Sequence, residues 1–252
     1  MTRIDLNCDV GERPDLIADG TQDALMDHVS SVNVACGAHA GDEATMEATV
    51  RAALRRGLAI GAHPGYPDRE GFGRRALPLG HEVIAHTVYH QVTTLAAIAA
   101  RCGATLRHVK PHGALYNLAA RDEGVARAVA RGVARWRTDL VLVGLAGSRM
   151  IEAFRAAGFP VAAEAFADRR YEPDGTLRAR THPDALLTDP ALAAAQALGI
   201  ATRGSAIAPD GRPVAIAAAT LCLHGDTPGG PALAAAVAAG LRAAGVEVAP
   251  LA

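Results

Sequence analysis

Four histidines stand just after short apolar runs, each with a glycine nearby. They are His39, His63, His112 and His224. Imidazole titrates near neutral pH and binds divalent metals, so these side chains could perform acid–base chemistry or hold an ion. A metal site would need two or three of them plus a carboxylate, and we expect His39 and His63 as its imidazoles. The pattern permits a metal site without requiring one.

Lys110 is the only lysine in a sequence that has 25 basic residues, so the other 24 are arginines. It lies in the segment RHVKPHG, three residues after Arg107 and two before His112. Lysine carries a compact ammonium, whereas arginine carries a planar fork. The composition therefore indicates that Lys110 occupies a site where the smaller cation is needed.

The elements that would position these residues alternate along the chain. Apolar runs predict strands near 3–7, 31–36, 58–62, 105–110, 140–144, 161–165 and 219–223, with a weak eighth near 246–249. Amphipathic segments predict helices near 43–56, 81–102, 122–135, 148–157, 190–199 and 231–244. Repeated strand–helix units are typical of parallel strands with crossover helices. Seven or eight units in 252 residues favour a closed α/β barrel with outer helices, and a doubly wound open sheet is the alternative.

We expect one domain over residues 1–252, because no change in composition or linker divides the chain. Two stretches interrupt the strand–helix rhythm, at about 167–189 and 201–216. Each contains Pro-Asp-Gly, a strong turn signal. They are predicted to be insertions at the barrel rim.

Several predicted strands carry polar residues on one face. The first has Asp5, Asn7 and Asp9 in alternation, and the others contribute Asn33, His108, Lys110, Glu164, Thr220, Cys222 and His224. Alternation places such a set on the same side of a strand, here the barrel interior. Buried polar groups are costly unless they are paired or used. A self-satisfied polar plug is one interpretation, and a catalytic site at the carboxyl ends of the strands is the one we favour.

Two loops offer guanidinium groups to an anion. Residues 65–75 carry Arg69 and Arg74 among glycines, and residues 167–171 carry Asp168 and Arg169. Forked donors suit a carboxylate or a phosphate. Salt bridges in a solvated loop are the alternative.

Composition excludes several classes of partner. The net charge is −1, which gives no reason to expect nucleic acid or an anionic membrane. No apolar run reaches the length of about 18 residues that a membrane span needs, and the first residues lack a signal-peptide pattern. The four cysteines lie far apart, against both a disulfide framework and a structural zinc site. We expect a cytoplasmic protein.

Eight segments together resemble the LamB/YcsF family. They are DLNCDVGE (5–12), NVACGAHAGD (33–42), GAHPGYPDR (61–69), FGR (72–74), VKPHGALYN (109–117), VGLAGS (143–148), EAFADR (164–169) and LHGD (223–226). Their order is also that of the family, and the match spans about residues 5 to 226. Cys8 and Ala38 depart from it, since many members carry Ala and Phe at these positions. Both are small changes beside the expected site.

The resemblance implies a (β/α)7-type barrel like those of carbohydrate deacetylases. The family includes one component of a bacterial ATP-dependent 5-oxoprolinase, which implies partner subunits B and C, 5-oxoproline as substrate, and ATP with Mg²⁺ as its counter-ion. A homo-oligomer stays open.

On this interpretation the enzyme opens a lactam and needs a cation for phosphoryl oxygens, a base for water and an acid for the departing nitrogen. We expect catalysis from Asp9, Lys110, His112 and Glu164. Substrate binding is expected from Asn7, Arg69, Arg74, Tyr116, Asp168, Arg169 and His224. Two other functions compete: a metal-dependent amide hydrolase or deacetylase that uses no ATP, and a non-catalytic subunit of the complex.

Overall fold

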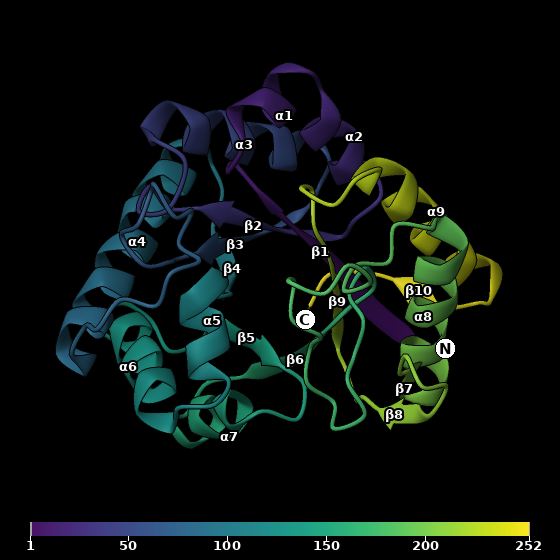
Figure 1. Cartoon of the computed structure of the whole chain (residues 1–252). Helices are drawn as coiled ribbons and strands as arrows, with labels where there is room; N and C mark the ends of the chain where they lie inside the picture. Colours follow the sequence, from purple (N-terminus) through teal and green to yellow (C-terminus); the bar gives the residue numbers. More distant parts are fainter. Residues whose placement is uncertain (1, 252) are drawn as a thin grey trace.

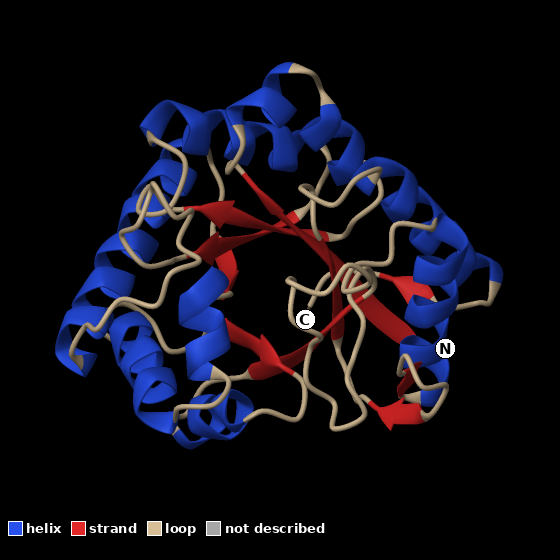
Figure 2. Ribbon diagram, viewed as in Figure 1, coloured by secondary structure: helices blue, strands red, loops and turns tan. Residues whose placement is uncertain are grey.

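Seven parallel strands close into a barrel in the computed structural model, which describes residues 2–251. Figure 1 looks along the barrel axis, with the strands at the centre and the helices around them, and Figure 2 shows the same view by element type. In ring order the strands are β1 (Arg3–Val10), β2 (Ser31–Ala35), β3 (Ala59–His63), β4 (Leu106–Val109), β5 (Val141–Leu145), β6 (Val161–Phe166) and β9 (Thr220–Leu223), which pairs with β1. The predicted closed barrel is confirmed.

The weak eighth apolar run forms β10 (Glu247–Val248), which is not one of the barrel strands. It pairs with Arg3 and Ile4 at the start of β1, beyond the ring. Because β1 already pairs with β2 and β9 along its later residues, β10 adds only an edge at the amino-terminal end of the barrel.

Helices cover the outside of the barrel. Those in the predicted positions are α3 (Glu43–Arg55), α4 (His81–Arg101), α6 (Glu123–Ala134), α7 (Arg149–Ala156), α8 (Pro190–Arg203) and α9 (Gly230–Ala243). Three short helices were not predicted: α1 (Pro14–Ala18), α2 (Thr21–Met26) and α5 (Gly113–Ala119). Segments of five to seven residues span too few turns to show a helical period in the sequence.

The two interruptions in the strand–helix rhythm take different forms. The stretch 167–189 is a loop with isolated bridges between Arg169 and Leu186 and between Tyr171 and Leu177. The second stretch begins within the last turn of α8 and contains an antiparallel hairpin of β7 (Ser205–Ile207) and β8 (Pro213–Ala215). The single-domain organisation stays a prediction.

The barrel interior is polar along its axis, as the alternation of residues predicts. Register places Asp9 beside Asn33, and Gly61 beside His108. A Cβ atom on Gly61 would overlap the ring of His108, so the glycine makes room for a fully inward-pointing imidazole. That imidazole donates from Nε2 to Oδ1 of Asn33 at 2.8 Å. Gly61 of β3, which has no side chain, therefore leaves the space that the ring of His108 on β4 occupies.

We predict that Gly61→Ala lowers the free energy of unfolding by about 1–3 kcal/mol, because the methyl group must displace His108 in a packed interior. Urea unfolding measures the change. Gly80→Ala is the matched control, since a Cβ at Gly80 meets no atom within 4 Å. Equal stability of the two variants would contradict the role of Gly61.

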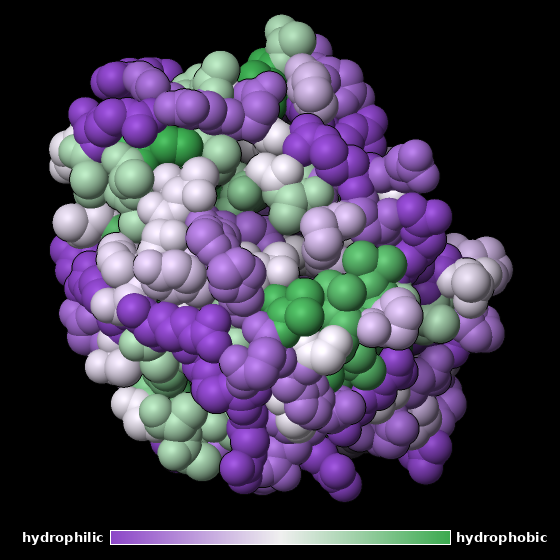
Figure 3. Space-filling view, turned by 90° about the vertical axis from the view of Figure 1, so that its left-hand side faces the viewer, coloured by the Kyte–Doolittle hydropathy of each residue, from purple (hydrophilic) through white to green (hydrophobic). Residues whose placement is uncertain are grey.

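The outer surface carries both kinds of residue. Figure 3 shows the side of α4 and α6, where hydrophilic and hydrophobic side chains are interspersed around one compact hydrophobic group. Among the exposed large hydrophobic residues, Leu54 lies on α3 and Val83 on α4. Within residues 2–251, no helix combines the length and the apolar character needed to cross a membrane.

Candidate functional site

A cavity of about 1340 Å³ opens at the carboxyl ends of the strands. Its lining includes nine residues of interest: Asp9, Glu12, His63, Arg74, Lys110, His112, Tyr116, Arg169 and His224. Seven of the nine stand at or just after the ends of β1, β3, β4, β6 and β9, where barrel enzymes carry their chemistry. The alternation of residues along the strands and the positions of the strand ends therefore predict from the sequence which residues gather at this cavity.

Lys110 occupies the floor of the cavity. Its Nζ lies 3.0 Å from Oδ1 of Asp9, 3.0 Å from Oε1 of Glu164 and 3.0 Å from Sγ of Cys222. Burial alone would lower the pKa of Lys110, but the negative charges of Asp9 and Glu164 outweigh it, and the pKa is raised well above the ordinary value. The group is a fixed ammonium held by two carboxylates.

An amide network holds this ammonium and its carboxylates in place. Nδ2 of Asn33 donates to Oδ1 of Asp9 at 2.8 Å and to Oδ1 of Asn7 at 2.7 Å. Nδ2 of Asn7 donates in turn to Oε1 of Glu164 at 3.1 Å. Asn7 is buried and does not line the cavity, so it acts through Glu164, Asn33 and Lys110, whose Nζ donates to Oδ1 of Asn7 at 3.4 Å. His108 anchors the network from below and stays neutral, because burial lowers its pKa to about 3.

Glu12, which the sequence analysis missed, is the centre of a histidine cluster beside the lysine. Its Oε1 lies 3.0 Å from Nε2 of His39, 3.1 Å from Nδ1 of His112 and 3.7 Å from Nε2 of His63. Burial raises the pKa of Glu12, but hydrogen bonds from His112 and His39 overcome this and lower it. The residue closes the DLNCDVGE segment, three positions beyond Asp9 and outside the strand, so strand parity could not place it.

Two backbone carbonyls fix the tautomers of His63 and His112. Nδ1 of His63 donates to the carbonyl of Lys110 at 2.7 Å, and Nε2 of His112 donates to the carbonyl of Phe72 at 2.8 Å. The remaining nitrogens, Nε2 of His63 and Nδ1 of His112, then face each other at 3.0 Å with lone pairs when both rings are neutral. Such an arrangement needs a positive charge between them, either a proton or a metal ion.

The donor set of Glu12, His63 and His112 fits a metal ion. The three atoms lie 3.0 to 3.7 Å apart. Bonds of about 2 Å at tetrahedral angles require donors about 3.3 Å apart. His39 is not in this set: its ring stacks on His112 at 3.8 Å between centroids, and burial lowers its pKa to about 4. Of the expected pair of metal imidazoles, the structure thus groups only His63 with further ligand atoms.

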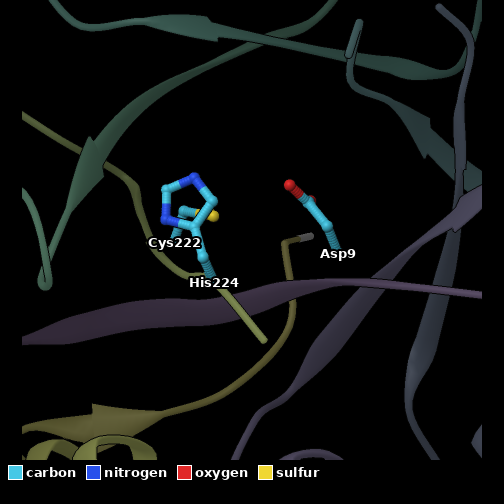
Figure 4. A group of neighbouring side chains, drawn as sticks. All are labelled: Asp9, Cys222 and His224. Atoms are coloured by element: carbon cyan, nitrogen blue, oxygen red, sulfur yellow. The ribbon is translucent and has the colours of Figure 1, made fainter. Parts of the chain in front are cut away.

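A second group of possible ligands consists of Asp9, Cys222 and His224, whose donor atoms lie within 4.8 Å of one another. Figure 4 shows the carboxylate of Asp9 pointing toward the ring of His224, with Cys222 beside the ring. Burial raises the pKa of the Cys222 thiol well above its ordinary value, so it stays protonated. The ammonium of Lys110 already contacts Asp9 and Cys222. With a protonated thiol and an ammonium in contact with it, this group of side chains is better placed to contact a substrate than to bind a metal ion.

His224 is held by a fully buried carboxylate. Its Nδ1 lies 3.0 Å from Oδ1 of Asp168, and its backbone N–H donates to Oδ2 at 3.0 Å. Oγ1 of Thr227 donates to the same Oδ2 at 2.8 Å. Burial raises the pKa of Asp168, but the charge and hydrogen bonds of His224 lower it below the ordinary value. Asp168 therefore positions His224, and does not itself line the cavity.

The remaining candidates divide between the cavity and its surroundings. Arg74, Arg169 and Tyr116 line the cavity. Arg69 does not, because its guanidinium donates to the carbonyls of Gly37 at 2.6 Å and Gly41 at 2.9 Å and so fastens two loops. The four cysteines are free, as expected from their spacing.

Comparisons with known proteins identify the family of this chain. The LamB/YcsF family profile matches residues 4–252. The chain is 55% identical over 248 residues to the 5-oxoprolinase A subunit of Chloroflexus aggregans, covering 98% of each chain. It is 49% identical to the protein of the same name from Methylococcus capsulatus, covering 98% of this chain and 95% of that one. The crystal structure of a lactam utilization protein from Thermus thermophilus has a TM-score of 0.92 and 43% identity, covering 99% of this chain and all of that one. This chain therefore belongs to the LamB/YcsF family.

Proposed function

We propose that this protein is the lactam-opening subunit of an ATP-dependent 5-oxoprolinase, which converts 5-oxo-L-proline to L-glutamate with partner subunits B and C. The names of the relatives support the substrate and a complex of several subunits. The observation that carries the proposal is a cavity in which a fixed ammonium, a histidine–carboxylate cluster and an oriented histidine surround one space.

The chemistry of the lactam explains why ATP is needed. An unstrained amide is a poor electrophile, and transfer of the γ-phosphoryl group of MgATP to the amide oxygen makes its carbon reactive. Water adds to that carbon and gives a tetrahedral species with two possible leaving groups. Loss of phosphate merely restores the lactam, whereas protonation and loss of nitrogen opens the ring to an acyl phosphate. Hydrolysis of the acyl phosphate then yields glutamate and phosphate.

The residues of the cavity match these requirements. Lys110, supported by Asp9 and Glu164, stabilises negative charge that develops on oxygen. His112 with Glu12 takes the proton from the attacking water. His224, oriented by Asp168 from across the cavity, delivers a proton to the departing nitrogen. The phenol of Tyr116, buried and without a hydrogen-bond partner among the described residues, is available to the substrate.

Reconstitution tests the proposal. The chain is combined with the candidate B and C subunits, and 5-oxoproline-dependent release of ADP and glutamate is followed. We expect glutamate only when this chain is present. Glutamate formation by the other subunits alone would refute the proposal, and so would full activity of a complex carrying Asp9→Asn, which a non-catalytic subunit would tolerate.

One observation favours a second function, a metal-dependent amide hydrolase: the facing lone pairs of His63 and His112 beside Glu12. A divalent ion held by these three residues would polarise a carbonyl and acidify a bound water. This function predicts lactam or amide hydrolysis that is lost with chelators and does not require ATP.

Metal uptake provides a direct prediction. We expect the wild-type chain to take up one equivalent of zinc in a calorimetric titration, with the stoichiometry checked by elemental analysis. His112→Gln should weaken binding at least about 100-fold, because it removes one of three ligands. His86→Gln is the matched control and should bind zinc normally, since His86 is exposed on α4 and lies outside the ligand set. Absence of uptake by the wild type would show that a proton alone satisfies the two rings.

A further inference from the structure

The floor of the cavity carries more negative than positive charge. Asp9 and Glu12 line it, Glu164 and Asp168 are buried behind it, and Lys110 is the permanent cation among these four carboxylates. The carboxylate group of a substrate would be repelled here, because the ammonium already contacts two carboxylates at 3.0 Å. An anionic substrate needs its anchor elsewhere in the cavity.

The side of the cavity formed by the loop after β6 has the opposite character. Arg169 and Arg180 line the cavity there, and Arg74 joins them from the loop after β3. Asp226 pairs with two of the three: its Oδ2 lies 2.5 Å from NH2 of Arg74 and 3.5 Å from NH1 of Arg180. Three guanidinium groups against two carboxylates, those of Asp226 and the exposed Asp174, leave this side positively charged.

Arg169 is the unusual member of this group. Only 8% of its surface is exposed, yet its Nε has no hydrogen-bond partner within the described chain. One side-chain bond holds it, from NH2 to the carbonyl of Arg178 at 2.7 Å. Burial lowers the pKa of Arg169, and the nearby charge of Arg180 lowers it further. The buried Arg169 guanidinium thus has a free N–H donor at Nε and a like charge beside it. Both features indicate a site for an anionic ligand.

We propose that Arg169, assisted by Arg180, binds the carboxylate of the substrate and so selects lactams that carry an acidic group next to the ring nitrogen. The inference rests on the proposed function and deepens it. Arg169 directly follows Asp168, the residue that orients His224. In 5-oxoproline the carboxylate is borne by the carbon bonded to the nitrogen. Anchoring this carboxylate at Arg169 therefore brings the nitrogen toward His224 and leaves the carbonyl carbon for the side of Asp9 and Lys110.

Equilibrium binding to the isolated chain tests the assignment without turnover. The probes are 5-oxo-L-proline, its neutral carboxamide of nearly equal size, and inorganic phosphate as a competitor. We expect the wild type to prefer the acid over the carboxamide by about tenfold or more, as one charge-assisted fork provides. Arg169→Gln should abolish this preference while the affinity for the carboxamide changes less than about threefold. Arg169→Lys should restore only part of it.

Two further variants keep the test decisive. Arg149→Gln is the matched control: Arg149 is exposed at the same cavity and should leave the preference intact. Arg180→Gln should reduce the preference without loss of folding and serves if Arg169→Gln does not fold. Persistence of the preference in Arg169→Gln and Arg180→Gln overturns the assignment, as does phosphate competing at Arg169 while acid and carboxamide bind equally. If the wild type binds neither lactam, the proposed substrate fails as well, whereas equal binding of both refutes only the carboxylate anchor.

Discussion

Replacing Lys110 by alanine is expected to lower 5-oxoproline-dependent glutamate formation about 1000-fold in the reconstituted complex. The ammonium is the permanent cation at the floor of the cavity, and the loss of one preorganised charge opposite a developing oxyanion has an effect of this size. Steady-state glutamate release measures it. Retention of a tenth of the activity would remove Lys110 from the mechanism.

The loss of activity in Lys110→Ala must be distinguished from a failure of the variant to fold. Without the ammonium, Asp9 and the buried Glu164 keep their hydrogen bonds from Asn33 and Asn7 but lose their shared counter-charge, which costs about 3–5 kcal/mol. Circular dichroism identifies unfolded protein, and added ethylammonium should restore part of the activity of a folded Lys110→Ala chain by filling the vacated position. Lys110→Arg should stay inactive, because a planar fork cannot replace a point charge that has three partners at 3.0 Å.

Asp168→Asn is expected to uncouple the release of ADP from the formation of glutamate in the reconstituted complex. The imidazolium of His224 loses the carboxylate that stabilises it, so the nitrogen is protonated more slowly. The tetrahedral species then loses phosphate instead and returns to lactam. Glutamate formation should fall about 100-fold while ADP release falls much less, so the ratio of ADP to glutamate should rise well above that of the wild-type complex.

Asp174→Asn is the matched control for this substitution. Asp174 lines the same cavity, is exposed and bonds only within its own turn, to Thr176. It should keep the wild-type ratio. Nitrogen NMR shifts of His224 should change in Asp168→Asn but not in the control. If ADP release and glutamate formation fell by the same factor, Asp168 would act before the tetrahedral species chooses between loss of phosphate and loss of nitrogen. That result would refute the assignment of His224 as the acid for nitrogen.

The fold and much of the site could be predicted from local sequence patterns. Strand–helix alternation located the seven staves, and period-two alternation placed Asn7, Asp9, Lys110 and Glu164 inside the barrel. These signals act over a few residues. They are strong because a strand in a closed barrel must direct alternate side chains inward.

The interactions that the sequence did not reveal depend on pairing between distant segments. Glu12 lies beyond the end of β1, and it meets His39, His63 and His112 only because three other loops converge on it. Arg69 looks like an anion ligand in the sequence, yet two carbonyls near residue 40 take its donors. The requirement for glycine at position 61 likewise appears only when β3 and β4 are side by side.

Pairing of β1 with β9 has a consequence for biosynthesis. The bond from Thr220 to Asp5 joins residues 215 positions apart, and Asn7 reaches Thr220 in the same layer. The ribosome therefore synthesises β1 long before β9, and β1 lacks this neighbour during the interval. Closure of such a distant contact is slow, and until then the edges of β1 and β6 stay unpaired. The candidate site is complete only once β9 has brought Cys222 and His224 beside Asp9, so we expect nascent chains that stop before β9 to be inactive and prone to aggregation.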